Sequence, residues 1–309
     1  MQKAESNIHK EQNDSAHHSV IVERPPTLET CGRVRKRGPR SLEAVTRRNS
    51  NTENPFGLQV PQGGGLCKSK PAPPYKDSSF TLLCMNIRGF LSHHVELSAH
   101  LEFIGMPSFV GLTETWLTNV VGSISLPGYT LVSRRDRNDG RQGGGIVLFA
   151  RDSFVAQIVH IEDSTEYERS WHILHTDFGA LCVGLWYRPP AHGEVGSIHS
   201  LVSEHEKYSS ECVGTLIVGD MNVHYKPWLK YSNGNSPEGR ALFDTSCRLG
   251  FHQSVQKPTR GEYLLDLVLT DVEALAKTSI VPKIADHNGV LGSVRATVEV
   301  STARKRKVF

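Results

Sequence analysis

Eight side chains of the sequence could share one chemistry, because each follows or borders a short apolar run. They are Asn86, Glu114, Tyr187, Asp220, Asn222, Asp266, Asp286 and His287. Carboxylate and carboxamide oxygens are hard ligands that suit Mg²⁺, and Mn²⁺ accepts the same donors. A histidine beside an aspartate can orient a water, transfer a proton or stabilise negative charge. Together these groups could hydrolyse a phosphate ester with the help of a metal ion.

Asp266 carries the most information of the eight, since it lies between Leu265 and Leu267 in the apolar run LLDLVLT. A carboxylate inside an apolar strand needs a partner. A nearby basic side chain would satisfy it without any function, whereas pairing with His287 would build a catalytic dyad. The other positions are weaker signals singly, because an Asp-X-Asn sequence after a strand is usually an Asx-turn.

The elements that must position these groups are mostly strands. Apolar runs separated by Gly, Asp and Asn predict strands, and helical spacing or a glycine stop predicts helices. The strands are expected near 79–87, 108–113, 129–135, 145–151, 170–177, 181–188, 215–222, 263–270, 279–281 and 289–300, and the helices near 91–104, 197–209 and 238–250. Many strands with a few interspersed helices indicate an α/β sandwich of two sheets with helices outside. Side chains at strand ends would then meet at a shared rim.

The charge distribution divides the chain into three segments. Residues 1–77 carry 13 Lys and Arg against 8 Asp and Glu, lack a sustained apolar period and are expected to be a disordered basic segment. Residues 78–300 carry 18 basic against 24 acidic residues and form the expected globular domain, and residues 301–309 form a basic tail. The acidic domain argues against a protein that coats DNA, since backbone binding neutralises phosphates. The basic ends suit nucleic acid or an import receptor, or are simply solvated.

Several classes of protein are excluded by simple patterns. No run of about 18 apolar residues could span a membrane, and the N-terminus lacks the apolar core of a secretory signal. None of the six cysteines forms a Cys-X-X-Cys pair, which excludes a zinc finger. We therefore expect a soluble intracellular protein with no membrane partner.

The ordered motifs MNIRG, LTETWL, YRPP, GDMN, LLDLVLT and DH resemble the endonuclease/exonuclease/phosphatase superfamily. Finer details look like the apurinic-type endonuclease domain of LINE-like (non-LTR) retrotransposons. These details are GGGIVLFAR, GDMNVHYKPW, SPEGRALFD and KPTR before LDLVLT. The resemblance covers about residues 78–300. It implies a four-layered α/β sandwich with two central mixed β-sheets flanked by helices.

The resemblance also implies a role for each site residue. Glu114 would be the principal Mg²⁺ ligand, with Asn86 and Asp286 close by. Asp220 would orient or deprotonate the attacking water, and Asn222 would hold the phosphate or Asp220 in place.

The remaining three residues would act on the phosphate itself. His287, paired with Asp266, would bind a scissile phosphate oxygen and stabilise developing charge. Tyr187 would add a hydrogen bond to the phosphate. Cleavage would leave a 3′-hydroxyl and a 5′-phosphate, and in the family that 3′-hydroxyl primes reverse transcription. A reverse transcriptase domain outside this chain would then be a partner.

The sequence departs from the family pattern at two positions and in length. Ala285 stands where the family usually has Ser before the Asp-His pair, and a lost hydrogen bond there would cost about 1 kcal/mol, which weakens activity without abolishing it. Arg88 stands where apurinic endonucleases often place an acidic neighbour of the metal. Only nine residues follow the domain, so we expect a truncated element, a captured domain or a gene-model fragment.

Contacts with DNA are expected from one loop and one aromatic residue. The loop at 133–145 carries Arg134, Arg135, Arg137 and Arg141, which could contact the phosphate backbone or merely solvate a hairpin. Trp228 could stack on a splayed base, although packing is the commoner role of such a residue. The basic clusters at 33–40 and 304–307 resemble nuclear import signals, which indicates the nucleus.

Three functions remain open from the sequence. The first is a Mg²⁺-dependent DNA endonuclease that nicks one strand. The second is another phosphoesterase or an RNA nuclease of the same superfamily, since the same site chemistry serves several substrates. The third is a catalytically inactive retrotransposon remnant that still binds nucleic acid.

Overall fold

The structure is a computed structural model that describes residues 79–272 and 275–294 of the 309-residue chain, apart from the side chains at 275 and 276. The segment 1–77 and the tail 301–309 lie outside the described residues, as do both basic clusters. The assignment of these segments as disordered or basic arms therefore stays a prediction. All elements given below fall inside the predicted domain at 78–300.

Two mixed six-stranded sheets form the centre of the described part. In spatial order, the first sheet contains β11 (Leu275–Val281), β12 (Gly289–Val294), β1 (Phe80–Asn86), β2 (Phe109–Thr113), β4 (Ile146–Arg151) and β3 (Tyr129–Arg135). The second contains β5 (Ile158–Asp163), β6 (Arg169–Thr176), β7 (Gly179–Tyr187), β8 (Gly214–Asp220), β10 (Asp266–Thr270) and β9 (His252–Gln253).

The two sheets have the same order of parallel and antiparallel strand pairs. Each has a parallel pair at its centre, β1 with β2 in the first sheet and β7 with β8 in the second. Every other neighbouring pair in both sheets is antiparallel. The parallel pairs matter for the site, because the carboxyl ends of parallel strands lie at the same edge of a sheet.

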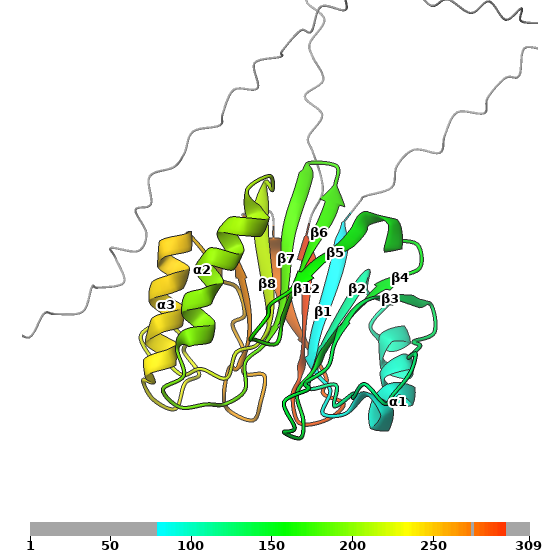
Figure 1. Ribbon diagram of the computed structural model, residues 1–309, viewed down its shortest axis with the longest axis horizontal. Coiled ribbons are helices and arrows are strands. Elements are labelled where there is room, and N and C mark those ends of the chain that lie inside the picture. Colours follow the sequence, from blue (N-terminus) through cyan, green and yellow to red (C-terminus); the bar gives the residue numbers. More distant parts are fainter. Residues whose placement is uncertain (1–78, 273–274, 295–309) are drawn as a thin grey trace, which may run out of the picture. The chain divides into compact units, whose positions relative to one another are not determined.

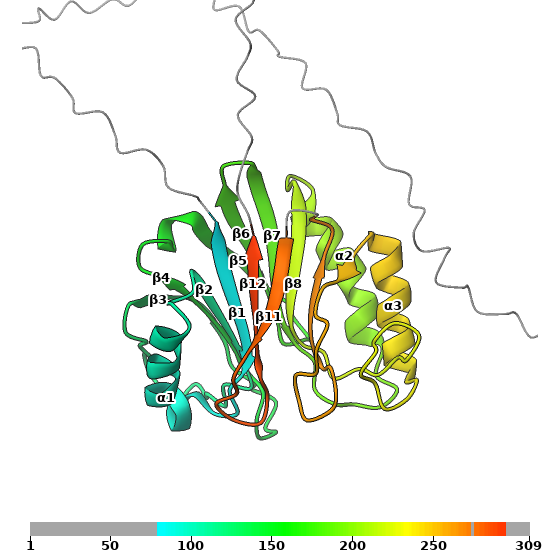
Figure 2. The ribbon, with the colours of Figure 1, turned by 180° about the vertical axis from the view of Figure 1, so that it is seen from behind.

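Helices cover the outer faces of the packed sheets (Figure 1). Helix α1 (Phe90–Phe103) lies against the first sheet, and α2 (Gly196–Ser209) and α3 (Pro237–Leu249) lie against the second. The reverse view shows the same four layers from behind (Figure 2). A short 3₁₀-helix, η2 (Val155–Gln157), leads into β5. The predicted four-layered α/β sandwich is therefore confirmed.

The strand β1 shows why the central strands are almost continuously apolar. Its residues alternate between two hydrophobic clusters, one between the sheets and one beneath α1. Leu82 and Cys84 belong to the cluster between the sheets. Leu83 and Met85 belong to the other cluster, together with Leu97 of α1. A strand that is buried on both faces needs apolar residues at successive positions and not only at every second one.

Helix α3 is defined by local signals that the sequence displays. The side chain of Ser236 accepts a hydrogen bond from the backbone N–H of Gly239, Pro237 occupies the first turn, and Gly250 ends the helix at φ 77°. Helix α1 follows its predicted span, but not all of its apolar residues face the core. Leu91 and Val95 are exposed, whereas Phe90, Leu97 and Leu101 face the sheet.

Candidate active site

The site forms where the central strands of both sheets end, at the lower edge of the sandwich in Figure 1. In the first sheet, Asn86 at the end of β1 is in register with Thr113 at the end of β2, and Glu114 follows directly. In the second sheet, Tyr187 at the end of β7 is in register with Asp220 at the end of β8. Parallel pairing thus brings four sequence-distant segments to one edge.

Antiparallel strands bring the remaining groups to the same edge. Strand β10 runs against β8, and its first residue, Asp266, is in register with Asp220. Strand β12 runs against β1 and begins at Gly289, just after Asp286 and His287. The antiparallel partner of a strand begins where that strand ends, so both segments arrive at the rim.

Two hydrogen bonds hold Glu114 in place. The hydroxyl of Tyr187 donates to Oε1 of Glu114 at 2.5 Å, and the indole N–H of Trp116 donates to Oε2 at 2.7 Å. The first bond crosses from one sheet to the other. Burial, together with the hydrogen bond to Glu114, raises the pKa of Tyr187. The phenol therefore keeps its proton and remains a donor at neutral pH.

Asn86 and Asp220 form a second link between the sheets. The amide nitrogen of Asn86 donates to Oδ2 of Asp220 at 2.9 Å, and both side chains are buried. Burial and the nearby charge of Asp266 raise the pKa of Asp220 to about 7, although Asn86 and His287 favour the ionised form. A carboxyl group that titrates near neutrality can take up a proton from water.

Asp266 pairs with His287, which confirms the more specific of the two partners considered for it. Oδ2 of Asp266 lies 2.7 Å from Nδ1 of His287, and both residues are buried. Burial lowers the pKa of His287, but the hydrogen bond and charge of Asp266, together with the charges of Asp220 and Asp286, raise the pKa overall. The other ring nitrogen, Nε2, lies 4.0 Å from Oδ2 of Asp220. The imidazole thus stands between two carboxylates.

Asp286 is held by two arginines that the sequence analysis did not place in the site. Oδ2 of Asp286 accepts from Arg88 at 3.0 Å and pairs with Arg260 at 2.9 Å. The charges of His287 and of both arginines keep the pKa of Asp286 below its usual value, although burial opposes them. The only sequence signals for these arginines were the departure at position 88 and the KPTR motif.

Asn222 lies at the rim but does not bond to Asp220. Its amide nitrogen donates to the backbone carbonyl of Arg188 at 3.0 Å. It lines a cavity of about 540 Å³ together with Arg260 and Tyr263. Asn222 thus lies beside this cavity, and because its amide nitrogen carries a second N–H, both expected roles, at the phosphate and at Asp220, stay predictions.

The backbone is strained at this rim. Positive φ angles outside glycine occur at Arg88 (43°), Glu114 (53°), Trp116 (55°) and Asn222 (47°), and at one position elsewhere in the described residues, Met106. Such conformations are uncommon for residues with a Cβ and persist only where the surroundings enforce them. Their concentration here supports a functional rim.

The donors at the rim fit a divalent metal ion. Oδ1 of Asp220, Asp266 and Asp286 are buried and have no hydrogen-bond partner. Buried carboxylate oxygens without a partner are costly, and a cation would compensate them. Asp220, Asp266 and His287 also offer ligand atoms within 4.8 Å of one another. Most donors in this set are oxygen atoms, which suit Mg²⁺ or Mn²⁺ better than they suit the metals that prefer histidine.

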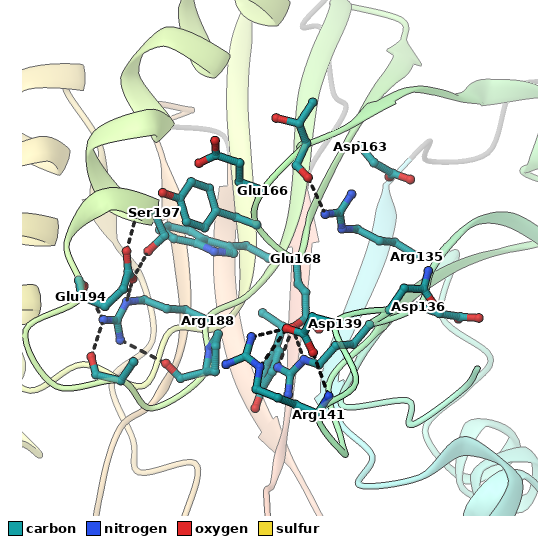
Figure 3. Close-up of a pocket in the computed structure, with 18 of the residues that line it drawn as sticks. Arg135, Asp136, Asp139, Arg141, Asp163, Glu166, Glu168, Arg188, Glu194 and Ser197 are labelled. Atoms are coloured by element: carbon teal, nitrogen blue, oxygen red, sulfur yellow. Dashed lines mark hydrogen bonds and ion pairs between the residues drawn. The ribbon is translucent and has the colours of Figure 1, made fainter. Parts of the chain in front are cut away.

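The arginine-rich loop lines a cavity of about 710 Å³ beside Tyr187 (Figure 3). Arg134 and Arg137 are held inside the protein, by ion pairs of 2.7 Å with Asp136 and 2.5 Å with Glu168. Arg135 makes only a long hydrogen bond of 3.5 Å, to the carbonyl of Thr165.

Arg141 and Trp228 differ in what they present to a substrate. The side chain of Arg141 is 64% exposed and pairs with Asp139. Trp228 packs against the core, and its ring lies 5.6 Å from that of Phe243. Its position favours packing, and a contact with DNA stays a prediction.

Three of the solved structures that resemble this chain illustrate its fold. The endonuclease domain of TRAS1, a telomere-specific non-LTR retrotransposon, matches 71% of this chain and 99% of its own, with a TM-score of 0.55 and 16% identity. A 3′-5′ exonuclease from Neisseria meningitidis matches 70% of this chain and 99% of its own, with a TM-score of 0.51 and 13% identity. An endonuclease/exonuclease/phosphatase family protein from Leptotrichia buccalis matches 70% of this chain and 99% of its own, with a TM-score of 0.50 and 11% identity.

These likenesses define the class of fold. No protein-family model matches the chain, and no curated protein matches it in sequence. The chain has the fold of the endonuclease/exonuclease/phosphatase superfamily, as its motifs predicted. None of the helices within 79–272 and 275–294 is long and apolar enough to cross a membrane.

Proposed function

We propose that this protein is a divalent-metal-dependent phosphodiesterase, and specifically a DNA endonuclease that nicks one strand and leaves a 3′-hydroxyl. The observation that carries the proposal is the convergence of Glu114, Asp220, Asp266 and His287 at one rim, with buried carboxylate oxygens that lack partners. The names of the similar structures, which include nucleases, support hydrolysis of phosphodiesters.

Glu114, Asn86 and Asp286 would hold the metal ion, which we take to be Mg²⁺ with Mn²⁺ as a substitute. When bound, the ion would neutralise charge that develops on the phosphate. The alternative set of Asp220, Asp266 and His287 is close enough to bind a cation. We favour the first set because it leaves the hydrogen bond between Asp266 and His287 intact.

The protein's own groups can move the protons. Ionised Asp220, fixed through Oδ2 by Asn86, presents Oδ1 to a water and can accept its proton. Protonated His287, held by Asp266, can donate from Nε2 to a non-bridging phosphate oxygen. The hydroxyl of Tyr187 donates to Glu114, so a phosphate contact of Tyr187 would have to share this hydroxyl with Glu114.

Positive charge for the substrate would come from individual arginines, since residues 78–300 carry more acidic than basic groups. Arg88 and Arg260 lie at the rim beside His287 and are each about half exposed. Arg135 and Arg141 would extend this contact along the loop. Arg134 and Arg137 are largely buried in their ion pairs, so we expect them to act mainly by shaping the loop.

DNA is the proposed substrate because the retrotransposon-like motifs surround the site residues. An origin from a non-LTR element, a reverse transcriptase partner and a nuclear location belong to the same proposal. A direct comparison of supercoiled DNA, single-stranded RNA and inositol phosphates, incubated with the full-length chain and Mg²⁺, tests it. Preferential turnover of DNA, with nicks that a polymerase can extend, is expected. If RNA or inositol phosphates are turned over faster than DNA, the proposal of DNA as the substrate is wrong.

A further inference from the structure

Glu168 occupies a junction between the two sheets that no catalytic role explains. It lies in the turn between β5 and β6, at the wall of the cavity in Figure 3. Its carboxylate pairs with Arg137 of the β3–β4 loop at 2.5 Å. The two side chains are only 10% and 8% exposed. A buried ion pair at this position joins a loop of the first sheet to a loop of the second.

The carboxylate of Glu168 also holds the glycine-rich end of the β3–β4 loop. Its Oε2 accepts a hydrogen bond from the backbone N–H of Gly145. Gly145 has φ 85°, and a Cβ there would lie 2.6 Å from Oγ1 of Thr115. The carbonyl of Gly145 accepts from the N–H of Thr115 at 3.2 Å, and the carbonyl of Gly144 accepts from the N–H of Trp116 at 2.9 Å. The glycines therefore allow a close backbone approach to the segment that follows Glu114.

The other side of Glu168 leads to Tyr187. The backbone carbonyl of Glu168 accepts from the N–H of Tyr187 at 2.8 Å. The guanidinium of Arg137 lies 5.6 Å from the centre of the Tyr187 ring. Since Tyr187 donates to Glu114, the contacts close a ring that runs through Glu168, Gly145, Thr115, Glu114 and Tyr187. Glu114 is thus fixed from both directions by Glu168, on one side through its carboxylate and on the other through its backbone carbonyl.

We propose that Glu168, through its ion pair with Arg137, is a positioning residue that sets the orientation of Glu114 and Tyr187. The inference deepens the proposed function, because Glu114 is the principal metal ligand there. Glu168 itself needs no contact with the substrate. Its loss should therefore lower kcat while the affinity for DNA stays nearly constant. This reassigns Arg137 from a phosphate contact to a support of the site.

The kinetic test compares full-length Glu168→Gln with Glu166→Gln, which changes an exposed carboxylate two residues away. Residues that orient metal ligands typically contribute about 10-fold to 100-fold in activity, and we expect a loss of kcat in that range for Glu168→Gln. KM should change by less than about twofold, since uniform binding is retained. Wild-type kcat in Glu168→Gln, or an equal loss in Glu166→Gln, would overturn the proposal.

A double variant separates positioning from stability. Glu168→Gln leaves the Arg137 charge buried without its partner, whereas Arg137→Met/Glu168→Gln removes both charges. The double variant should recover thermal stability but keep the low kcat, because the Glu168–Arg137 ion pair is still absent and the guanidinium beside the Tyr187 ring is lost as well. If kcat recovers together with stability, the pair is merely structural and the proposal fails.

A spectroscopic measurement keeps the inference testable without activity. Trp116 donates to Glu114 and is 44% exposed, so its fluorescence reports on this segment. Its contribution is isolated by subtracting the signal of Trp116→Phe in each background. Acrylamide should quench Trp116 more strongly in Glu168→Gln than in wild type or Glu166→Gln. Unchanged quenching would contradict the inference, whereas a wild type that cleaves no phosphodiester would contradict only the proposed function.

Discussion

Asp266 and His287 are joined by a 2.7 Å hydrogen bond between buried atoms of two different segments, the start of β10 and the loop before β12. Because Nδ1 of His287 faces this carboxylate, Nε2 is left to face Asp220, 4.0 Å away. One carboxylate thus sets the charge of the imidazole, and the imidazole in turn stands beside the proposed water-activating group. The pair is the basis of the pH predictions below.

Asp266→Asn should shift the activity profile to lower pH and lower its maximum. Loss of the negative charge lowers the pKa of His287, so the protonated form is lost at lower pH and the alkaline limb moves down. The charge of Asp266 also raises the pKa of Asp220, so the acidic limb moves down as well. Acid–base groups contribute about 10²-fold to 10⁴-fold, and a loss of kcat in this range is expected. A full pH–rate profile measures the shift, with Asp244→Asn as the control because it changes an exposed carboxylate on α3. If neither limb of the profile moves in Asp266→Asn, the pair does not have this role.

Asp220→Asn should abolish cleavage yet stabilise the metal-free protein above pH 7. The folded state raises the pKa of Asp220 to about 7, whereas the unfolded chain titrates near 3.8. Stability is therefore lost as pH rises across this window, and Asn carries no such cost. Tm should rise by about 2–4 °C for each kcal/mol relieved. Thermal unfolding in EDTA at pH 5 and pH 8 checks this, and a variant less stable than wild type at pH 8 would contradict it.

Arg88→Gln and Arg260→Gln should weaken DNA binding and reduce its salt dependence. Each arginine that neutralises a phosphate contributes about one unit to the slope of log K against log salt. Anisotropy titrations of labelled DNA in EDTA at several salt concentrations measure the slope. Arg240→Gln, which removes an exposed arginine of α3, is the matched control. Slopes equal to wild type in both rim variants would exclude these arginines as phosphate contacts.

Arg169→Met should lower the free energy of unfolding of the domain, although Arg169 takes no part in the chemistry at the rim. Arg169 is fully buried, pairs with Glu204 at 2.7 Å and lies 4.6 Å from the centre of the Trp186 ring. Removal of one partner from a buried pair costs about 3–5 kcal/mol. Lys207→Met, which breaks an exposed pair with Glu162, should cost far less, because solvent screens that pair. Urea unfolding of both variants makes the comparison, and equal losses would contradict it.

Much of the site could be predicted because it depends on strand ends. The apolar runs before Asn86, Glu114, Tyr187 and Asp220 mark buried strands, and buried parallel strands end at a common edge. Asp266 could be expected to have a partner because it lies inside an apolar strand, and His287 was one of the two candidates. Helix α3 could be predicted as well, since its cap residues and its terminal glycine are local signals in the sequence.

The parts that escaped prediction depend on contacts between loops far apart in sequence. Arg88 and Asp286 are 198 residues apart, and no local pattern indicates that they meet. The hydrogen bonds of Glu168 likewise depend on how the two sheets pack. In α1, the helical spacing of apolar residues does not show which of them are buried: Leu91 and Val95 are exposed, whereas Leu97 and Leu101 face the sheet.

The central claim is that the rim built by Glu114, Asp220, Asp266 and His287 cleaves DNA with a divalent cation. Its most direct test is the conversion of supercoiled plasmid to open circles by the full-length chain, in Mg²⁺ and in EDTA, beside Asp220→Asn and Asp244→Asn. We predict nicking by wild type and Asp244→Asn in Mg²⁺, none in EDTA, and none by Asp220→Asn. Equal nicking by Asp220→Asn, or no nicking by folded wild type in Mg²⁺ or Mn²⁺, would contradict the account.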